Sequence, residues 1–154
     1  MTTHTVEEKK IEGKNFSVFH AGKFHDLLNY ELMHPRLNKK MRGKFLAKEE
    51  LGLTGMQVSL NQLPPGKGTL FSHQHKQNEE LYVFISGKGQ MQIDAEIIDV
   101  CEGSCVRIAT DGLRAWRNNG TEDLVCICIQ AKENSLDQHT FEDGIPKMEA
   151  PVWE

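Results

Sequence analysis

Short segments of alternating hydrophobicity follow one another from residue 56 to residue 130, and this pattern restricts the fold more than any other feature. Within residues 56–61, Met56, Val58 and Leu60 alternate with polar residues, as in a strand with one buried face. We expect further strands at residues 81–85, 90–94, 97–100, 105–108, 114–117 and 124–130. Turn residues separate these segments, and no helical pattern lies between them. The pattern therefore predicts an all-β sandwich or jelly roll.

The chain has 154 residues, a usual size for one domain with its own core. We predict a single domain over residues 1–154, in which residues 56–130 form the core of the barrel. Residues 1–55 would form an N-terminal extension that includes the first strands, and residues 131–154 a C-terminal tail. At residues 94–95 the sequence Asp-Ala stands where a hairpin favours Asp-Gly, so we expect a longer or non-primed turn there.

Further expectations concern the parts outside the barrel core. A helical spacing before Pro35 predicts a helix that follows an edge strand near residues 16–20, and its apolar residues are Phe24, Leu27, Leu28 and Leu32. In the tail, residues 135 and 138 have the residue types of a helix-capping pair. Trp153 is expected to anchor the tail on the barrel.

Composition excludes several classes of partner. The net charge is −4, and the short positive run Lys39, Lys40, Arg42 and Lys44 is expected to be solvated surface, which argues against nucleic-acid binding. We expect no membrane segment, because no apolar stretch approaches the roughly 20 residues of a membrane helix. No secretory signal pattern is visible, and the four cysteines lack the paired spacing of a zinc knuckle. We therefore predict reduced thiols and a cytoplasmic protein.

The sequence His73-Gln74-His75 is a candidate metal site. In a strand, side chains two residues apart point to the same face, so the two imidazoles can chelate one ion. A carboxylate from the next strand would complete a ligand set that suits Zn, Mn, Fe, Ni or Cu rather than Ca. Glu79 and Glu80 compete for this role. Strand alternation leaves both open, because residues 81–85 are apolar on either face.

The spacing of these residues resembles the first motif of the cupin superfamily, which reads glycine, five residues, His-x-His, three or four residues, Glu, six residues and Gly. Counting six residues back from Gly87 selects Glu80. The leading glycine is displaced, since Lys67 occupies its position. The resemblance covers residues 56–130. It implies a double-stranded β-helix, the jelly-roll cupin barrel, with one divalent first-row transition metal bound by His73, His75 and Glu80.

The second cupin motif is less complete. Gly103 and Asn118 match it, but Arg114 stands where the family has its fourth metal ligand, a histidine. A guanidinium has no lone pair for a metal. Arg114 would therefore either hold an anionic group of a ligand beside a three-ligand metal, or pair with Glu80 in a metal-free site. If Arg114 faces inward, Trp116 and Asn118 share its face by alternation. The predicted ligand-binding residues are Arg114, Tyr82, Trp116 and Asn118.

Three functional classes follow from the resemblance, and the fold does not decide between them. The first is a metal enzyme, such as a dioxygenase, an isomerase or a decarboxylase. The second is a module that binds a small anionic molecule, and the third is a metal-free interaction domain. We predict a metal-binding cupin of open activity with a small anionic ligand. The resemblance also implies a homodimer, since a strand as apolar on both faces as residues 81–85 must be covered twice.

Overall fold

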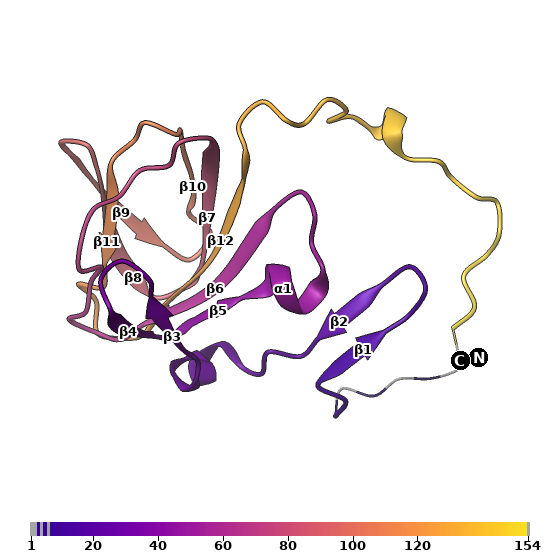
Figure 1. Cartoon of the computed structure of the whole chain (residues 1–154), viewed down its shortest axis with the longest axis horizontal. Helices are drawn as coiled ribbons and strands as arrows, with labels where there is room; N and C mark the ends of the chain where they lie inside the picture. The colour runs from indigo at the N-terminus through magenta and orange to yellow at the C-terminus, as the bar shows by residue number, and fades with distance from the viewer. Residues whose placement is uncertain (1–2, 4, 6, 154) are drawn as a thin grey trace.

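Strands make up most of the regular structure (Figure 1). The computed structural model describes residues 3, 5 and 7–153. Within these residues, no helix is long and apolar enough to cross a membrane. In chain order the elements are β1 (Lys10–Glu12), β2 (Ser17–Phe19), η1 (Phe24–Asn29), β3 (Glu31–His34), β4 (Lys39–Arg42), β5 (Lys44–Leu46), α1 (Ala47–Leu51), β6 (Gln57–Leu63), β7 (Asn78–Ser86), β8 (Lys88–Ile93), β9 (Glu96–Cys101), β10 (Cys105–Ile108), β11 (Arg114–Arg117), β12 (Leu124–Lys132) and η2 (Phe141–Asp143).

Two antiparallel sheets form the body of the molecule. One has five strands in the order β10-β7-β12-β6-β5, and the other has three in the order β11-β8-β9. The segment between β6 and β7 joins β11 only through two isolated bridges, at Gly68 with Arg117 and at His73 with Arg114, so the barrel is not closed by continuous pairing. This arrangement confirms the prediction of an all-β jelly roll.

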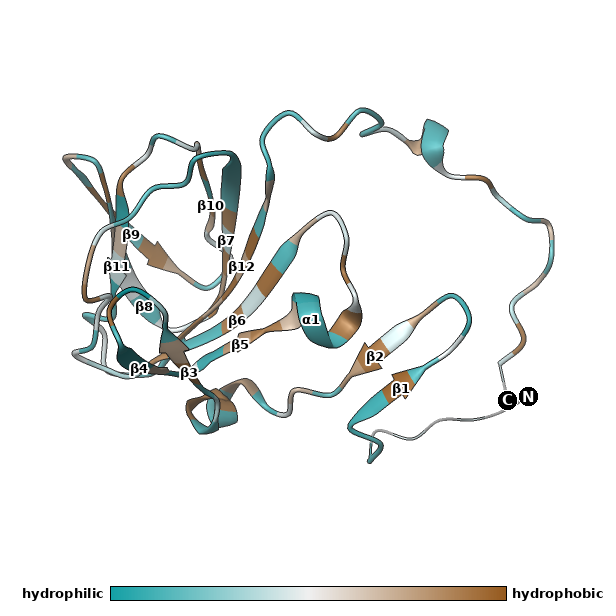
Figure 2. Cartoon of the chain, viewed as in Figure 1, coloured by the Kyte–Doolittle hydropathy of each residue, from teal (hydrophilic) through white to brown (hydrophobic). Residues whose placement is uncertain are grey.

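The main core lies between the two sheets, where strand alternation places apolar side chains on the inner faces. Figure 2 shows hydrophobic residues recurring along the barrel strands, β12 among them. Across the five-stranded sheet, Cys126 lies opposite Phe84 and Asn61, and Cys128 lies opposite Tyr82 and Ser59. Side chains directly opposite one another in antiparallel strands share a face, so these rows mark the inner face. The buried members of this core are Tyr82, Phe84, Met91, Val100, Ile108, Leu124, Cys126 and Cys128.

The predicted helix before Pro35 is wrong. Residues 24–29 form only the short 3-10 helix η1, and the chain continues as β3, which pairs with β4. Leu27 is fully buried in a second, smaller core with Phe45 and Ala47, on the outer side of β5 and β6. The apolar residues at helical spacing therefore belong to two different elements. Leu27 lies in η1, whereas Leu32 lies in β3 and pairs with Met41 of β4.

The connection between β8 and β9 also differs from expectation. Ile93 pairs with Glu96, so Asp94 and Ala95 form a two-residue turn, and Asp94 has φ +53°. A positive φ at the first central residue belongs to the primed turns that fit the twist of a hairpin. The Asp94 carboxylate accepts a hydrogen bond from the Leu113 amide at 2.9 Å, and this contact supports the unusual conformation.

The C-terminal tail does not pack on the barrel. It arches away from β12 as extended chain, and Trp153 is 87% exposed, so the predicted anchor is wrong (Figure 1). No helix begins at residue 135. The short helix η2 lies farther on, and its capping group is the Thr140 hydroxyl, which accepts a hydrogen bond from the Glu142 amide.

The two glycines that match the cupin motifs give a matched pair of mutations. Gly87 and Gly103 both have φ +84°, where a side chain costs about 1–2 kcal/mol. A Cβ at Gly87 would also lie 2.3 Å from the Asp123 carbonyl oxygen, whereas one at Gly103 would meet nothing within 4 Å. We expect Gly87→Ala to lower the free energy of unfolding by about 1–3 kcal/mol more than Gly103→Ala, measured by urea denaturation. Equal losses would contradict the close approach at Gly87.

Candidate metal centre and cavity

The two histidines lie in the extended segment that follows β6, rather than in a complete strand. His73 and Arg114 exchange two backbone hydrogen bonds, at 3.0 and 2.9 Å, and the His75 amide donates to the Thr110 carbonyl at 3.2 Å. His73 and His75, two residues apart, thus both form backbone hydrogen bonds with the adjacent stretch of residues 110–114. As the His-x-His pattern predicts, the imidazoles of His73 and His75 lie together, with ring centroids 5.2 Å apart.

The third donor comes from β7, and the structure separates the two competing glutamates. Glu80 points inward and is 4% exposed. Glu79 points outward, where its carboxylate pairs with Arg107 at 2.6 Å. The inward choice is therefore Glu80, the residue that the motif spacing selected.

The donor atoms of His73, His75 and Glu80 all lie within 4.8 Å of one another, close enough to hold one metal ion. His75 Nε2 and Glu80 Oε1 are 3.0 Å apart and share a hydrogen bond. Burial lowers the pKa of His73; Glu80 opposes this effect, but Arg114 adds to it, and the net shift is downward, so the imidazole is neutral at neutral pH. A neutral imidazole has a lone pair for a metal, so the donor set fits such an ion.

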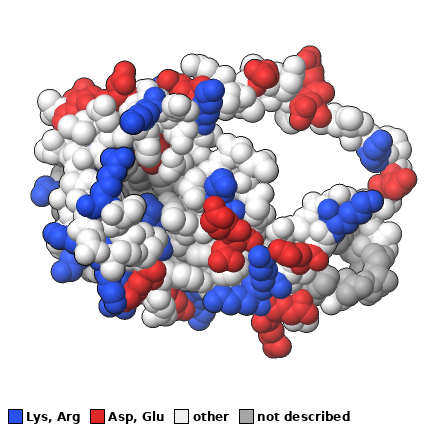
Figure 3. Space-filling model, viewed as in Figure 1, with Lys and Arg blue, Asp and Glu red and all other residues white. Residues whose placement is uncertain are grey.

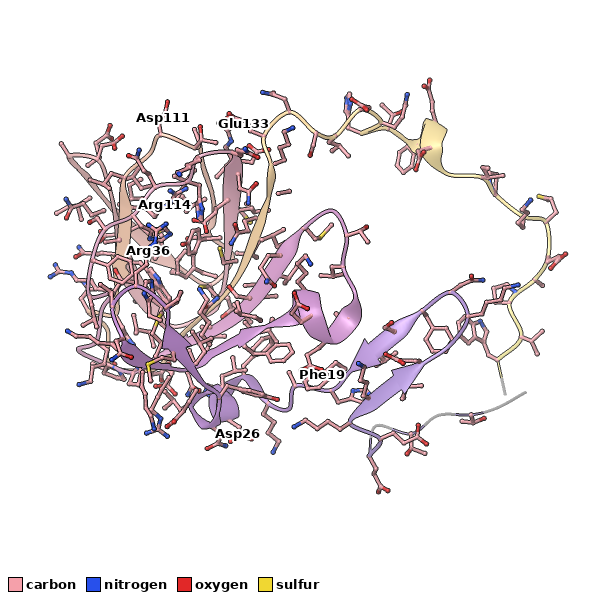
Figure 4. All side chains as sticks on the ribbon, in the orientation of Figure 1. Phe19, Asp26, Arg36, Asp111, Arg114 and Glu133 are labelled. Carbon is pink, nitrogen blue, oxygen red and sulfur yellow. The ribbon has the colours of Figure 1, made fainter. Side chains whose placement is uncertain are left out.

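Arg114 lies inside the barrel (Figure 4). Its guanidinium is in contact with the carboxylate of Glu80. The side chain is fully buried, and Nε is 3.1 Å from Glu80 Oε2. Neither of these two atoms makes a well-directed hydrogen bond within the described residues, so the contact is an ion pair with an unaligned N–H. The other guanidinium nitrogens face the carbonyl oxygens of His73 and Ala109, at 3.3 and 3.4 Å.

This ion pair determines the charge of Glu80. Burial alone would raise the pKa of the carboxyl group, but Arg114 and then His75 outweigh that effect and hold the pKa below its usual value. Glu80 is therefore ionised at neutral pH. Because the donors of Arg114 face Glu80 and two carbonyl groups, its guanidinium positions the carboxylate rather than an incoming ligand.

Two further polar groups lie beside Glu80. The Cys128 thiol donates to Glu80 Oε1 at 3.6 Å, and burial raises the pKa of this thiol to about 12, so it stays protonated. Burial also raises the pKa of Tyr82, whose phenol remains neutral and can donate a hydrogen bond but cannot serve as a base at neutral pH. The sequence did not identify Cys128 as part of the site, although its alternation with Cys126 placed both thiols on one face.

A cavity of about 590 Å³ opens beside two of the three donors, His73 and Glu80. His73, Glu80 and Tyr82 contribute to its lining, together with Trp116, whose ring lies 6.4 Å from that of Tyr82. The cavity is large enough for a small organic molecule. A second hollow of about 510 Å³ lies over β8 and β11 and contains none of the donors.

Asn118 differs from the other predicted ligand-binding residues. It is buried at the end of β11, where its amide nitrogen donates to the carbonyl groups of Leu63 and Glu122, both at 2.7 Å. Its side-chain oxygen accepts a hydrogen bond from the Gly120 amide at 2.9 Å. These bonds use the polar atoms of Asn118 to hold neighbouring loops, and the residue does not line the cavity beside the donors.

The positive run is solvated as expected at Lys39, Lys40 and Arg42, which are exposed, but Lys44 is half-buried. All four residues also line the cavity beside the donors. Basic side chains surround a hollow on the barrel face (Figure 3), and those that line the cavity are Lys39, Lys40, Arg42, Lys44 and Lys67. Four of them come from β4 and β5 in the N-terminal extension. Alternation along a short strand cannot show which face meets a cavity, so the sequence alone could not separate these residues from ordinary surface charges.

Comparison with known proteins supports the same fold. The Cupin domain family model matches residues 59–130. A cupin protein from Bacteroides fragilis is 42% identical, with a TM-score of 0.66, and the match covers 68% of this chain and 89% of that one. A candidate sugar phosphate isomerase from Acidithiobacillus ferrooxidans is 29% identical, with a TM-score of 0.53 and 58% of each chain covered. An uncharacterized protein of Methanocaldococcus jannaschii is 29% identical over 64% of this chain and 67% of its own length.

The buried ion pair predicts a large effect for one arginine and a small effect for another. Arg114→Met would leave Glu80 buried without its counter-charge, so we expect a loss of about 3–5 kcal/mol in the free energy of unfolding at pH 7. Arg107→Met removes an exposed partner of Glu79 and Glu133, and we expect a much smaller loss. Chemical denaturation measures both.

The same variant has a defined pH dependence. Without Arg114, burial raises the pKa of Glu80, so this carboxyl group takes up a proton at a higher pH than in the wild type. The deficit of Arg114→Met should therefore shrink as the pH falls below neutral, because a protonated Glu80 no longer needs a counter-charge. A deficit that stays constant down to pH 4 would contradict the assignment of the ion pair.

Proposed function

Because this chain belongs to the cupin family, we propose that it binds one divalent first-row metal, of the group Zn, Mn, Fe, Ni and Cu, through His73, His75 and Glu80. The observation that carries the proposal is the convergence of the three donor atoms within 4.8 Å. The cavity beside them would hold a small anionic organic molecule. When bound, such a metal supplies Lewis-acid chemistry to oxygen atoms of a ligand.

The charges of the site support an anionic ligand. Glu80 and Arg114 cancel one another, and the buried imidazole of His73 is neutral. A divalent metal would therefore leave about two positive charges facing a cavity that is itself lined by basic residues. A ligand with negative charge offsets this excess, whereas a neutral ligand does not. The protein's own groups would hold that ligand in place, with Tyr82 as a hydrogen-bond donor and Trp116 as an apolar wall.

The reaction class we propose is isomerisation, in preference to dioxygenation. The structural relative from Acidithiobacillus ferrooxidans that is a candidate sugar phosphate isomerase supports this choice. Glu80, one of the proposed metal donors, is held by Arg114 on one oxygen and by His75 on the other, so the donor set would be ordered before a ligand binds. Turnover of small sugar phosphates by metal-loaded protein, followed by NMR of the products, tests the assignment.

A second candidate function rests on one specific contact. The 3.1 Å ion pair between Arg114 and Glu80 already supplies a positive charge beside the carboxylate. In a metal-free protein this pair, with the hydrogen bond from His75, would complete the polar interior, and the cavity would serve for binding only. The two candidates differ in one measurable quantity, the amount of bound metal.

Elemental analysis of protein purified without chelators or a metal-affinity column decides between them. We expect close to one divalent metal per chain in the wild type and a large loss in His75→Ala, because two remaining donors bind a metal much more weakly. His139→Ala, in the exposed tail, is the matched control and should keep its metal. Metal retained in both His73→Ala and His75→Ala would place it elsewhere. A metal-free wild type that gains metal affinity on Arg114→His would support the second candidate.

We also propose that the protein is a homodimer that uses the outer face of the five-stranded sheet. On this face, β7 and β12 present Leu81, Val83, Ile127 and Ile129 in adjacent rows, and Leu81 remains 36% exposed. The N-terminal extension covers the outer side of β5 and β6 with its own small core. An apolar face beside it is suited to a second copy of the same surface.

The tail supports this proposal. It extends away from the barrel and encloses an open space together with the β1–β2 hairpin (Figure 3). Large apolar side chains that remain exposed suit the surface of a second copy. The exposed large apolar residues of the tail are Leu136, Phe141, Ile145, Met148, Val152 and Trp153.

Light scattering tests the dimer. At micromolar concentration we expect twice the chain mass of 17.5 kDa. Leu81→Lys should shift the equilibrium toward monomer, because it buries a charge in the proposed interface. Ile97→Lys is the control, since Ile97 is more exposed, at 64%, but lies on β9 in the other sheet. A wild type of monomer mass would refute the proposal. The location we propose is the cytoplasm, a reducing compartment, because all four cysteines are unpaired.

A further inference from the structure

Lys44 is the basic residue of the extension that enters the barrel. It is the first residue of β5 and lies opposite Asn61 on β6, which in turn lies opposite Cys126 on β12. Asn61 and Cys126 are buried on the inner face of the sheet, and directly opposed residues share a face. The side chain of Lys44 therefore points inward. It is half-buried and lines the cavity that contains His73 and Glu80.

The ammonium group of Lys44 has no counter-charge. Within residues 3, 5 and 7–153, no carboxylate or other hydrogen-bond acceptor lies in contact with it. By contrast, Lys40 and Arg42 both pair with Glu31, and Lys48 pairs with Glu49. A partly desolvated cation without a partner is costly, and an anionic ligand would remove that cost.

The rest of the lining increases the positive charge. Lys39 and Lys67, at the mouth of the cavity, also have no ion-pair partner in the described part of the chain. The acidic residue in the lining is Glu80, and Arg114 already neutralises it. Three lysines thus face the cavity without compensation. The excess is larger than a single carboxylate group would neutralise.

The type of side chain narrows the chemical class of the ligand. A planar arginine fork suits a carboxylate, and the one buried arginine of the site is already engaged with Glu80. Lysines act as compact point charges and bind phosphate oxygens from several directions. A phosphate monoester carries about −1.5 to −2 charges at neutral pH, close to what three lysines can share.

We propose that Lys44 anchors the ligand of the cavity, and that with Lys39 and Lys67 it selects small molecules that carry a phosphate monoester. The inference deepens the proposed function, since the other end of such a ligand would face His73, His75 and Glu80. It does not depend on metal, because the lysines are charged whether or not a metal is bound. The N-terminal extension then has a defined role, which is to bring a charge from β5 to the inner face of the barrel.

The test is a binding titration of metal-depleted protein with glycerol 3-phosphate, inorganic phosphate and acetate, followed by NMR of the backbone amides. The variants are Lys44→Met, Lys44→Arg and, as matched control, Lys48→Met. We expect saturable binding of both phosphates by the wild type and by Lys48→Met, and much weaker binding of acetate. Lys44→Met should bind phosphate about 10-fold to 100-fold more weakly, the range for loss of one charge-assisted hydrogen bond. Lys44→Arg should recover part of this loss.

Thermal unfolding without ligand separates an anchoring role from a structural one. A lysine that stabilises the fold would lower the Tm on replacement, whereas removal of an uncompensated half-buried charge should leave the Tm of Lys44→Met unchanged or raise it. The inference is overturned if Lys44→Met binds phosphate as the wild type does, if acetate binds as tightly as phosphate, or if the wild type binds neither phosphate.

The metal content of the same samples before depletion tests the proposed function separately. Lys44→Met should contain as much metal as the wild type, because Lys44 is not a donor. Weakened phosphate binding in a protein that never contained metal would uphold the anchor and refute the metal site. Normal metal content together with unchanged phosphate binding would refute the anchoring role of Lys44 and uphold the metal site.

Discussion

The buried ion pair between Glu80 and Arg114 connects the two sheets at the point where the three candidate metal donors meet. Glu80 belongs to β7 of the five-stranded sheet, and Arg114 belongs to β11 of the three-stranded sheet. The backbone of Arg114 also exchanges two hydrogen bonds with His73. One residue therefore holds a carboxylate through its side chain and a histidine through its main chain. Because an unpaired charge in this interior would be costly, the position of each group depends on the other.

Arg114 changes what this site can do compared with a cupin that has a histidine at that position. A histidine there would add a third imidazole and a fourth ligand, whereas the guanidinium adds a fixed positive charge beside a three-donor set. The charge keeps Glu80 ionised despite its burial. It also means that any divalent metal would add to a positive field. The basic lining of the cavity extends that field outward, and this charge is the reason that we propose an anionic ligand.

The N-terminal extension contributes to two surfaces of the barrel. Its 3-10 helix and Phe45 cover the outer side of β5 and β6 with a second core. Its strands β4 and β5 supply four of the five basic residues that line the cavity. Within β5, Phe45 is buried in the outer core while Lys44 lines the cavity, because successive side chains of a strand point to opposite faces. The three-residue strand β5 thus packs the extension on the barrel through Phe45 and places Lys44 in the cavity.

The sequence by itself determined the strands of the barrel, because a two-residue alternation is local and can be read along the chain. It also determined the spacing of His73, His75 and Glu80, which the structure brings to within 4.8 Å. Tertiary structure decided the rest. Strand pairing ended the expected helix at η1, and the tail leaves Trp153 exposed instead of packing it on the barrel. The inward direction of Arg114 and Lys44 was equally invisible in the sequence. Alternation states which residues share a face, but only the packing of one sheet against another decides which face is the interior.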